Sequence, residues 1–219
     1  MSFIQLQNIV KDFEIVKVLK GINLKIDFGE QCVIRGASGS GKSTLLYLLG
    51  GLDRATTGKI LINNENIEDY NDEQLALYRN LKVGFVFQFH FLLPTMNCLD
   101  NILLKAQIGN HKIKPIREQS IELAKYLGVE HCLKKFPFEL SGGEQQRINL
   151  IRALSLKPKI LLCDEPTGNL DSANSQKVTE LLKTLANDFK STLIVVTHDE
   201  RVASQFTRKI LIQDGMILN

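Results

Sequence analysis

Short runs of apolar residues recur along the chain and set its expected architecture. Runs such as Val83–Phe87 and Ile160–Cys163 contain no charged residue. Strands that are buried on both faces of a parallel sheet have this pattern, because neither face meets water. We expect core strands at residues 31–35, 83–87, 160–164, 192–196 and 209–213, a further strand-rich layer in 1–35 and 59–67, and a final hairpin turn at Gln213–Met216. The chain 1–219 is therefore expected to be a single α/β domain with an antiparallel β layer and a helical subdomain at about 89–156.

A glycine-rich segment lies between the first core strand and a run of leucines. It comprises Gly36, Ala37, Ser38, Gly39, Ser40, Gly41, Lys42, Ser43 and Thr44. Glycines let successive backbone N–H groups turn toward phosphate oxygens, and the following helix N-terminus favours an anion at the same point. Lys42 is expected to reach the β- and γ-phosphates, and the Ser43 hydroxyl to bind Mg²⁺. A turn that binds nothing is the alternative, but the complete motif between strand and helix favours a nucleoside triphosphate site.

Two carboxylates end the apolar run Ile160–Cys163. Asp164 and Glu165 follow it directly, so they are expected at the carboxyl end of a parallel strand, where α/β folds bind ligands. Successive side chains on a strand point in opposite directions, so the two acids can have different roles. Asp164 is expected to support Mg²⁺, and Glu165 to act as the general base toward water. Alternatively, both are solvated acids at a strand end.

The segment Leu140–Arg147 predicts a helix N-terminus. Ser141 and Glu144 have the spacing of a capping box, and Ile148, Ile151 and Leu154 continue at helical spacing. A capped N-terminus with two exposed glycines is able to bind an anion, or it is only a flexible helix start.

Five elements in order resemble the nucleotide-binding subunits of ATP-binding cassette (ABC) transporters, which have a P-loop NTPase core. They are the phosphate loop 36–44, Gln88 after a strand, the signature LSGGEQQR at 140–147, the block LLCDEPTGNLD at 161–171, and His198. The resemblance implies ATP and Mg²⁺ as cofactors and a head-to-tail homodimer that sandwiches two ATP molecules.

The resemblance also implies individual roles. Gln88 would contact Mg²⁺ and the attacking water, and His198 would contact the γ-phosphate and align Glu165. Ser141, Gly142 and Gly143 would contact the γ-phosphate held by the other subunit, and Asp171 would lie at the dimer interface. Phe13, which follows Lys11-Asp12, would stack on adenine; the alternative is a phenylalanine in the core of the β layer.

Composition limits the location and redox state. The longest apolar run, Leu45 to Leu52, is far shorter than the roughly eighteen residues that span a bilayer, and the N-terminus does not resemble a signal peptide. The four cysteines lack CxxC spacing, so we expect reduced thiols and no zinc site. The basic run His111–Arg117 is interpreted as a solvated loop.

An ATPase without a membrane span must pass its work to a partner. Phe89, Phe91 and Leu92 are interpreted as a docking patch for an integral membrane permease, or as core of the helical subdomain. The motifs resemble the lipoprotein-releasing and macrolide-exporter group, so we expect a peripheral protein at the cytoplasmic face of the inner membrane. A cell-division ATPase is the alternative. A nucleic-acid-associated ATPase is disfavoured, because no coiled coil separates the phosphate loop from the signature.

Overall fold

The computed structural model describes residues 2–168 and 172–218. Its centre is a six-stranded sheet with the order β10-β9-β3-β8-β7-β6. These strands are β3 (Gln31–Arg35), β6 (Val83–Phe87), β7 (Ile160–Asp164), β8 (Thr192–Thr197), β9 (Arg208–Gln213) and β10 (Met216–Leu218). The first five are parallel, and β10 pairs antiparallel with β9. All five predicted core strands are thus confirmed.

The predicted hairpin is also present. Asp214 and Gly215 join β9 to β10 with φ angles of 49° and 80°, the left-handed conformation that a tight hairpin turn requires.

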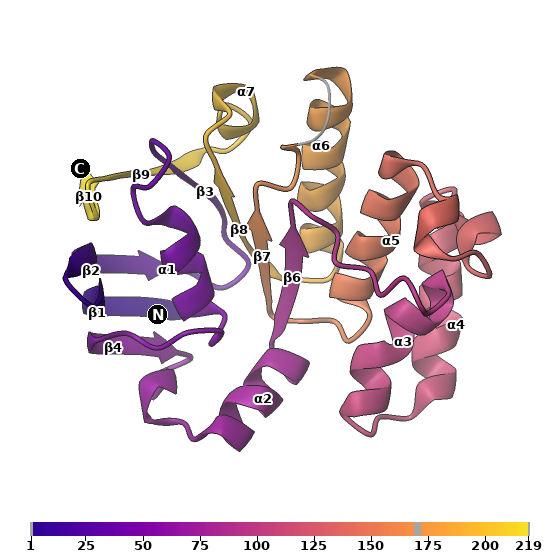
Figure 1. Cartoon of the computed structure of the whole chain (residues 1–219), viewed down its shortest axis with the longest axis horizontal. Coiled ribbons are helices and arrows are strands. Elements are labelled where there is room, and N and C mark those ends of the chain that lie inside the picture. Colours follow the sequence, from indigo (N-terminus) through magenta and orange to yellow (C-terminus); the bar gives the residue numbers. More distant parts are fainter. Residues whose placement is uncertain (1, 169–171, 219) are drawn as a thin grey trace.

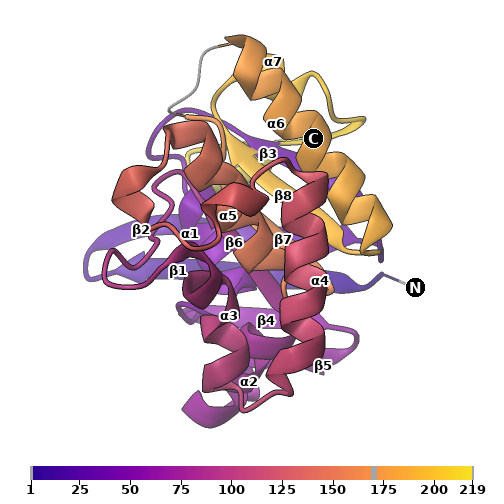
Figure 2. The same cartoon turned by 90° about the vertical axis from the view of Figure 1, so that its right-hand side faces the viewer.

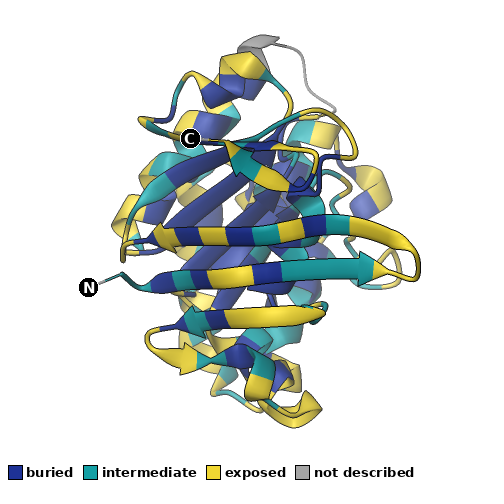
Figure 3. Cartoon of the chain, turned by 90° about the vertical axis from the view of Figure 1, so that its left-hand side faces the viewer, coloured by how far each residue is buried: buried dark blue, intermediate teal, exposed yellow. Residues whose placement is uncertain are grey.

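A second, antiparallel sheet packs beside the core sheet. It has the order β2-β1-β4-β5 and comprises β1 (Ile4–Phe13), β2 (Val16–Ile26), β4 (Thr57–Ile62) and β5 (Glu65–Asn66). Along β1 and β2 buried and exposed residues alternate over much of the length, as expected for a sheet with one face in the core (Figure 3). The short helix η1 (Ile67–Asp69) and helix α2 (Asp72–Leu81) connect this layer to β6.

Helices cover the opposite side of the core sheet (Figures 1 and 2). The segment between β6 and β7 contains α3 (Cys98–Ile108), α4 (Ile113–Tyr126), η2 (Glu130–Cys132), η3 (Pro137–Glu139) and α5 (Gly142–Leu154). Because α4 begins at Ile113, the interpretation of His111–Arg117 as a loop is wrong for most of its length; Pro115 lies in the first turn of the helix, where its missing N–H has no cost. Helices α6 (Ser172–Asp188) and α7 (Glu200–Ala203) flank β8.

The core sheet is buried on both faces, and β7 shows how. Ile160 and Leu162 pack with helix α1 (Lys42–Leu49) and the antiparallel layer, whereas Leu161 and Cys163 pack with α5 and α6. All four side chains have zero exposure, which explains why the sequence of this strand is continuously apolar. The central strands are therefore rigid supports for the residues at their carboxyl ends.

Candidate active site

The phosphate loop connects β3 to α1, as predicted. Two of its glycines are required by close packing: a Cβ atom on Gly36 would collide with the backbone oxygen of Ile212, and one on Gly41, at a φ of 100°, would lie 2.7 Å from a methyl group of Leu19. The Lys42 ammonium donates to the carbonyl oxygen of Ala37 at 2.8 Å, so the lysine side chain folds back across the loop. The loop is thus preformed around its lysine.

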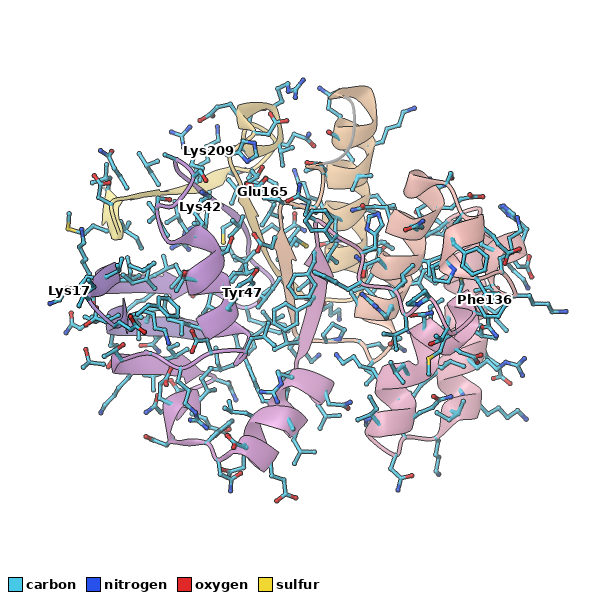
Figure 4. The ribbon with its side chains drawn as sticks, viewed as in Figure 1. Lys17, Lys42, Tyr47, Phe136, Glu165 and Lys209 are labelled. Atoms are coloured by element: carbon cyan, nitrogen blue, oxygen red, sulfur yellow. The ribbon has the colours of Figure 1, made fainter. Side chains whose placement is uncertain are left out.

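A cavity of about 480 Å³ opens beside this loop. It is lined by Val18, Ser38, Gly39, Gly41, Lys42, Ser43, Thr44, Gln88, Glu165 and His198. Figure 4 shows Lys42 and Glu165 at the same end of the core sheet. The structure therefore brings six of the candidate loop residues together with three candidates that are far from them in the sequence, Gln88, Glu165 and His198.

Other candidates lie outside this lining. Gly36, Ala37 and Ser40 belong to the loop but do not line the cavity. Phe13 is half-exposed at the end of β1, where the Lys11 ammonium lies 4.7 Å from its ring centroid. The exposure of Phe13 disfavours the alternative of a core phenylalanine and leaves its ring face accessible. Ser141, Gly142 and Gly143 also lie outside the cavity lining, and Asp171 lies outside the described residues.

Asp164 lies behind the loop and is fully hydrogen-bonded. One carboxylate oxygen accepts from the Ser43 hydroxyl at 2.9 Å, and the other accepts from the Tyr47 hydroxyl at 3.0 Å. Burial raises the pKa of the Asp164 carboxyl, although the hydrogen bonds from Ser43 and Tyr47 oppose this shift. A buried carboxylate beside a serine hydroxyl is a set of hard oxygen donors that suits Mg²⁺.

Glu165 is held in a strained backbone conformation with a φ of 46°. Its carboxylate accepts hydrogen bonds from the Thr197 hydroxyl at 2.9 Å and from the backbone N–H of His198 at 3.0 Å, and it lies 2.6 Å from Nδ1 of the same histidine. The side chain of Glu165 is 16% exposed and that of His198 is 69% exposed. Glu165 is therefore a fixed carboxylate at the wall of the cavity, and His198 extends from it toward solvent.

Gln88 follows β6 and packs against the segment after β7. A Cβ atom on Gly168 would lie 2.7 Å from Nε2 of Gln88, so this glycine makes room for the glutamine amide. Gln88, which follows β6, and the segment that follows the adjacent strand β7 thus meet at the cavity.

Two residues of the site were missed by the sequence reasoning. Tyr47 holds Asp164, and a signal for it exists: it lies four residues after Ser43 on α1, so both side chains emerge on one face of the helix. Thr197 positions Glu165 and directly precedes His198. No sequence motif marks Thr197, because its role depends on the pairing of β7 with β8.

The signature segment forms the start of α5, as predicted. One Glu144 oxygen accepts from both the backbone N–H of Ser141 at 2.8 Å and the Ser141 hydroxyl at 2.6 Å. These hydrogen bonds lower the pKa of Glu144 to about 2, and the bond from the Ser141 hydroxyl has the largest effect. Ser141 and Gly142 are exposed, and a Cβ atom on Gly142 would meet nothing within 4 Å. Packing against residues 2–168 and 172–218 therefore gives no reason for a glycine at position 142.

Comparison with known proteins decides the family. The family described as ABC transporter matches residues 19–168. The chain belongs to the ABC transporter family.

Similar proteins cover nearly the whole chain. The lipoprotein-releasing system ATP-binding protein LolD of Cytophaga hutchinsonii is 43% identical over 96% of both chains. The protein of the same name from Aquifex aeolicus is 42% identical over 99% of this chain and 96% of its own. Among solved structures, the dimeric bacterial ABC transporter cassette MJ0796 is 38% identical, with a TM-score of 0.89 over 99% of this chain and 97% of the other. A second structure of that cassette is described as a post-hydrolysis state bound to ADP and Pi, with the same scores.

These matches confirm the expected ABC-type fold and its enzyme class. The chain is an ATP-binding and ATP-hydrolysing cassette of an ABC complex. Within residues 2–168 and 172–218, none of the helices has the length and apolar character needed to cross a membrane.

Proposed function

We propose that this cassette powers a membrane complex that releases lipoproteins, and that it works at the cytoplasmic face of that membrane with an integral membrane permease. The observation that carries this proposal is the run of relatives named as lipoprotein-releasing ATPases, 43% identical in the first case and matched over 96% of both chains. Such coverage leaves little room for a difference in overall organisation. A cell-division ATPase remains the alternative outcome of the test given below.

Within one chain, ATP would bind in the cavity beside the phosphate loop. Lys42 would leave the carbonyl oxygen of Ala37 and pair with the β- and γ-phosphates, and the backbone N–H groups of the loop would hold the phosphate oxygens. Bound Mg²⁺, held by Ser43, Gln88 and Asp164, would neutralise phosphate charge. Phe13 would stack on the adenine ring.

Hydrolysis requires an activated water molecule. Glu165 would take a proton from this water as it attacks the γ-phosphorus, because its carboxylate is fixed in the cavity wall by Thr197 and His198. His198 lies on the solvent side of Glu165, so it is placed to contact the γ-phosphate and to keep Glu165 aligned with the water.

The signature would act on ATP that is bound to a second copy of the chain. A Cβ atom on Gly142 would meet no other described residue within 4 Å, and a glycine that packing does not require suits a backbone that a ligand approaches closely. Ser141 and Gly143 flank it at the N-terminus of α5, whose positive dipole end favours a phosphate. A head-to-tail homodimer, with Asp171 at its interface, would place each signature over the other cavity.

The permease would dock on a groove between the core sheet and the helical subdomain. We define this coupling groove by its lining residues: Leu52, Arg79, Phe85, Phe87, Asn101, Leu104, Lys105, Ile108, Arg152 and Ala153. Its volume is about 280 Å³, and Leu52 and Ile108 on its rim are 48% and 74% exposed. Burial lowers the pKa of Lys105 to about 8. An amphipathic segment that offers apolar side chains and a carboxylate fits this lining.

The loop after Gln88 connects the ATP cavity to the coupling groove. Phe89 and Phe91 are each 63% exposed, and the Phe91 ring lies edge-on to Phe87 in the groove wall at 5.4 Å. Arg152 donates to the carbonyl oxygens of Phe91 at 2.7 Å and His90 at 2.6 Å, so the loop is fixed to α5. Leu92 is partly buried against the core cluster between the sheet and the helices, so it would contribute less surface to docking than Phe89 and Phe91.

Phe91→Asp tests the proposed function. A charge in a docking surface that becomes dry costs a few kcal/mol, so co-purification with the permease should fall at least tenfold while ATP binding by the isolated chain is unchanged. Tyr126→Asp is the matched control, because Tyr126 is an aromatic residue of the same subdomain and is 66% exposed.

The cellular outcome of the same variant distinguishes the candidate functions. In cells that depend on Phe91→Asp, lipoproteins should accumulate in the inner membrane. Normal lipoprotein sorting with a defect in cell separation would select the division function instead. An unchanged complex would show that the Phe89–Phe91 surface does not dock the permease.

A further inference from the structure

Three potential metal ligands meet beside the signature helix. His131 and Cys132 belong to η2, and Glu144 lies in the first turn of α5, twelve residues after Cys132. Their ligand atoms all lie within 4.8 Å of one another. The His131 Nε2 and Glu144 Oε1 atoms are 2.9 Å apart, and the Cys132 sulfur lies 3.4 Å from each of them.

These separations are close to those of a tetrahedral zinc site. Zinc binds sulfur at about 2.3 Å and nitrogen or oxygen at about 2.0–2.2 Å, so two tetrahedral ligands lie roughly 3.3–3.6 Å apart. The two sulfur separations already have this value, and the nitrogen and oxygen atoms need to separate by only a few tenths of an ångström.

Two of the three ligands are already oriented by other contacts. The Glu144 oxygen that faces the cluster is Oε1, because Oε2 accepts both hydrogen bonds from Ser141. The backbone N–H of Cys132 donates to the carbonyl oxygen of Val129, which fixes η2. The His131 side chain is 57% exposed, so an ion has a route from solvent and a fourth position remains for water.

We propose that His131, Cys132 and Glu144 bind one Zn²⁺ or a similarly soft divalent ion, which ties η2 to the first turn of the signature helix. Imidazole, thiolate and carboxylate are zinc ligands, whereas Mg²⁺ and Ca²⁺ prefer oxygen alone. Metal binding displaces a proton: the Cys132 thiol loses its proton to water, and the resulting thiolate forms the sulfur–zinc bond.

Protonation in the ion-free chain follows from the surroundings of the sulfur. Burial raises the pKa of the Cys132 thiol to about 11, so the thiol must give up its proton to become a ligand near neutral pH. The sequence expectation of no zinc site depended on cysteine spacing alone. That expectation did not consider a set in which only one ligand is a cysteine and the third ligand comes from another element.

Cobalt binding by the tag-free chain, without nucleotide, tests the proposal. One Co²⁺ per chain should bind with the visible absorption of a tetrahedral site and a thiolate-to-metal charge-transfer band, and Zn²⁺ should displace it while excess Mg²⁺ should not. Cys132→Ser should remove the charge-transfer band. His131→Ala should weaken Zn²⁺ affinity at least about tenfold, since even the loss of a residue that only supports a ligand costs about 10–100-fold.

Cys98→Ser is the matched control, because Cys98 is a second buried thiol of the same subdomain that lies outside the ligand set. It should bind Co²⁺ as the parent chain does. The unfolding temperature of each ion-free variant shows whether it is folded, and His131→Ala removes a largely exposed side chain in case Cys132→Ser fails to fold. Unchanged Co²⁺ binding by a folded His131→Ala variant, or loss of the band in Cys98→Ser, would overturn the proposed ligand set.

Discussion

The ATP cavity and the signature surface differ in how far one chain completes them. Glu165 in the cavity wall and Asp164 behind the phosphate loop each have two hydrogen-bond partners on other elements. At the signature, the side chain of Ser141 hydrogen-bonds to Glu144 in its own helix turn, and a Cβ atom on Gly142 would face open space among the described residues. One chain therefore preorganises Glu165 and the phosphate loop, whereas the exposed signature has the character that our proposal of contact with a second molecule requires.

The largest expected effect comes from the base on the cavity side. Glu165→Gln keeps the shape and most of the hydrogen bonds of the side chain but removes the proton acceptor, so ATP turnover should fall about 10²- to 10⁴-fold. ATP affinity should remain, because Lys42 and the loop are untouched. Steady-state hydrolysis and equilibrium ATP binding measure the two quantities. Glu200→Gln, at an exposed glutamate that pairs with Arg35, is the control and should keep full activity.

Two glycine substitutions should separate stability from activity. Gly142→Asp places a side chain in open space at a helix N-terminus, so the unfolding temperature should be unchanged, whereas ATPase activity should fall about 10²-fold because a carboxylate meets the partner's γ-phosphate. Gly36→Ala should instead destabilise the fold by about 1–3 kcal/mol, because its Cβ atom would collide with the backbone at Ile212. Thermal unfolding and ATP hydrolysis are measured for both. A Gly142→Asp chain that hydrolyses ATP normally would show that the signature contacts no phosphate.

The smallest expected effect concerns the free energy of unfolding of the nucleotide-free chain, which the burial of charged Asp164 lowers. Because burial raises its pKa, folded Asp164 holds a proton more tightly than the unfolded chain does, so its contribution to stability is present at low pH and is lost as the pH rises through the folded pKa. Asp164→Asn removes this cost, so the nucleotide-free variant should unfold at a slightly higher temperature than the parent at neutral pH and at the same temperature in acid. MgATP at a hundred times its Kd should stabilise the parent by about 2.7 kcal/mol and the variant by less. A variant that is less stable at neutral pH would show that the hydrogen bonds of Asp164 outweigh its burial.

Much of this architecture follows from local sequence. The core strands are apolar along their whole length because both faces are buried, so periodicity identifies them, and the phosphate loop is recognisable because its glycines have fixed spacing. By contrast, Tyr47, Thr197 and the His131–Glu144 pair act through contacts between separate elements. Their roles depend on strand pairing and helix packing, which no local pattern encodes. The loop assignment at His111–Arg117 failed for the same reason, since the apolar face of α4 is defined by what it packs against.

Mixing two inactive variants tests the central claim that the cavity of one chain is completed by the signature of another. Lys42→Ala disables a cavity and Ser141→Arg disables a signature, so a heterodimer has one composite site with both defects and one with neither. Single-turnover hydrolysis should therefore return in proportion to the fraction of heterodimer, whether or not repeated turnover needs two intact sites. If heterodimers form and bind ATP but hydrolyse no more of it than either parent, the two elements do not act across a dimer and the account is contradicted.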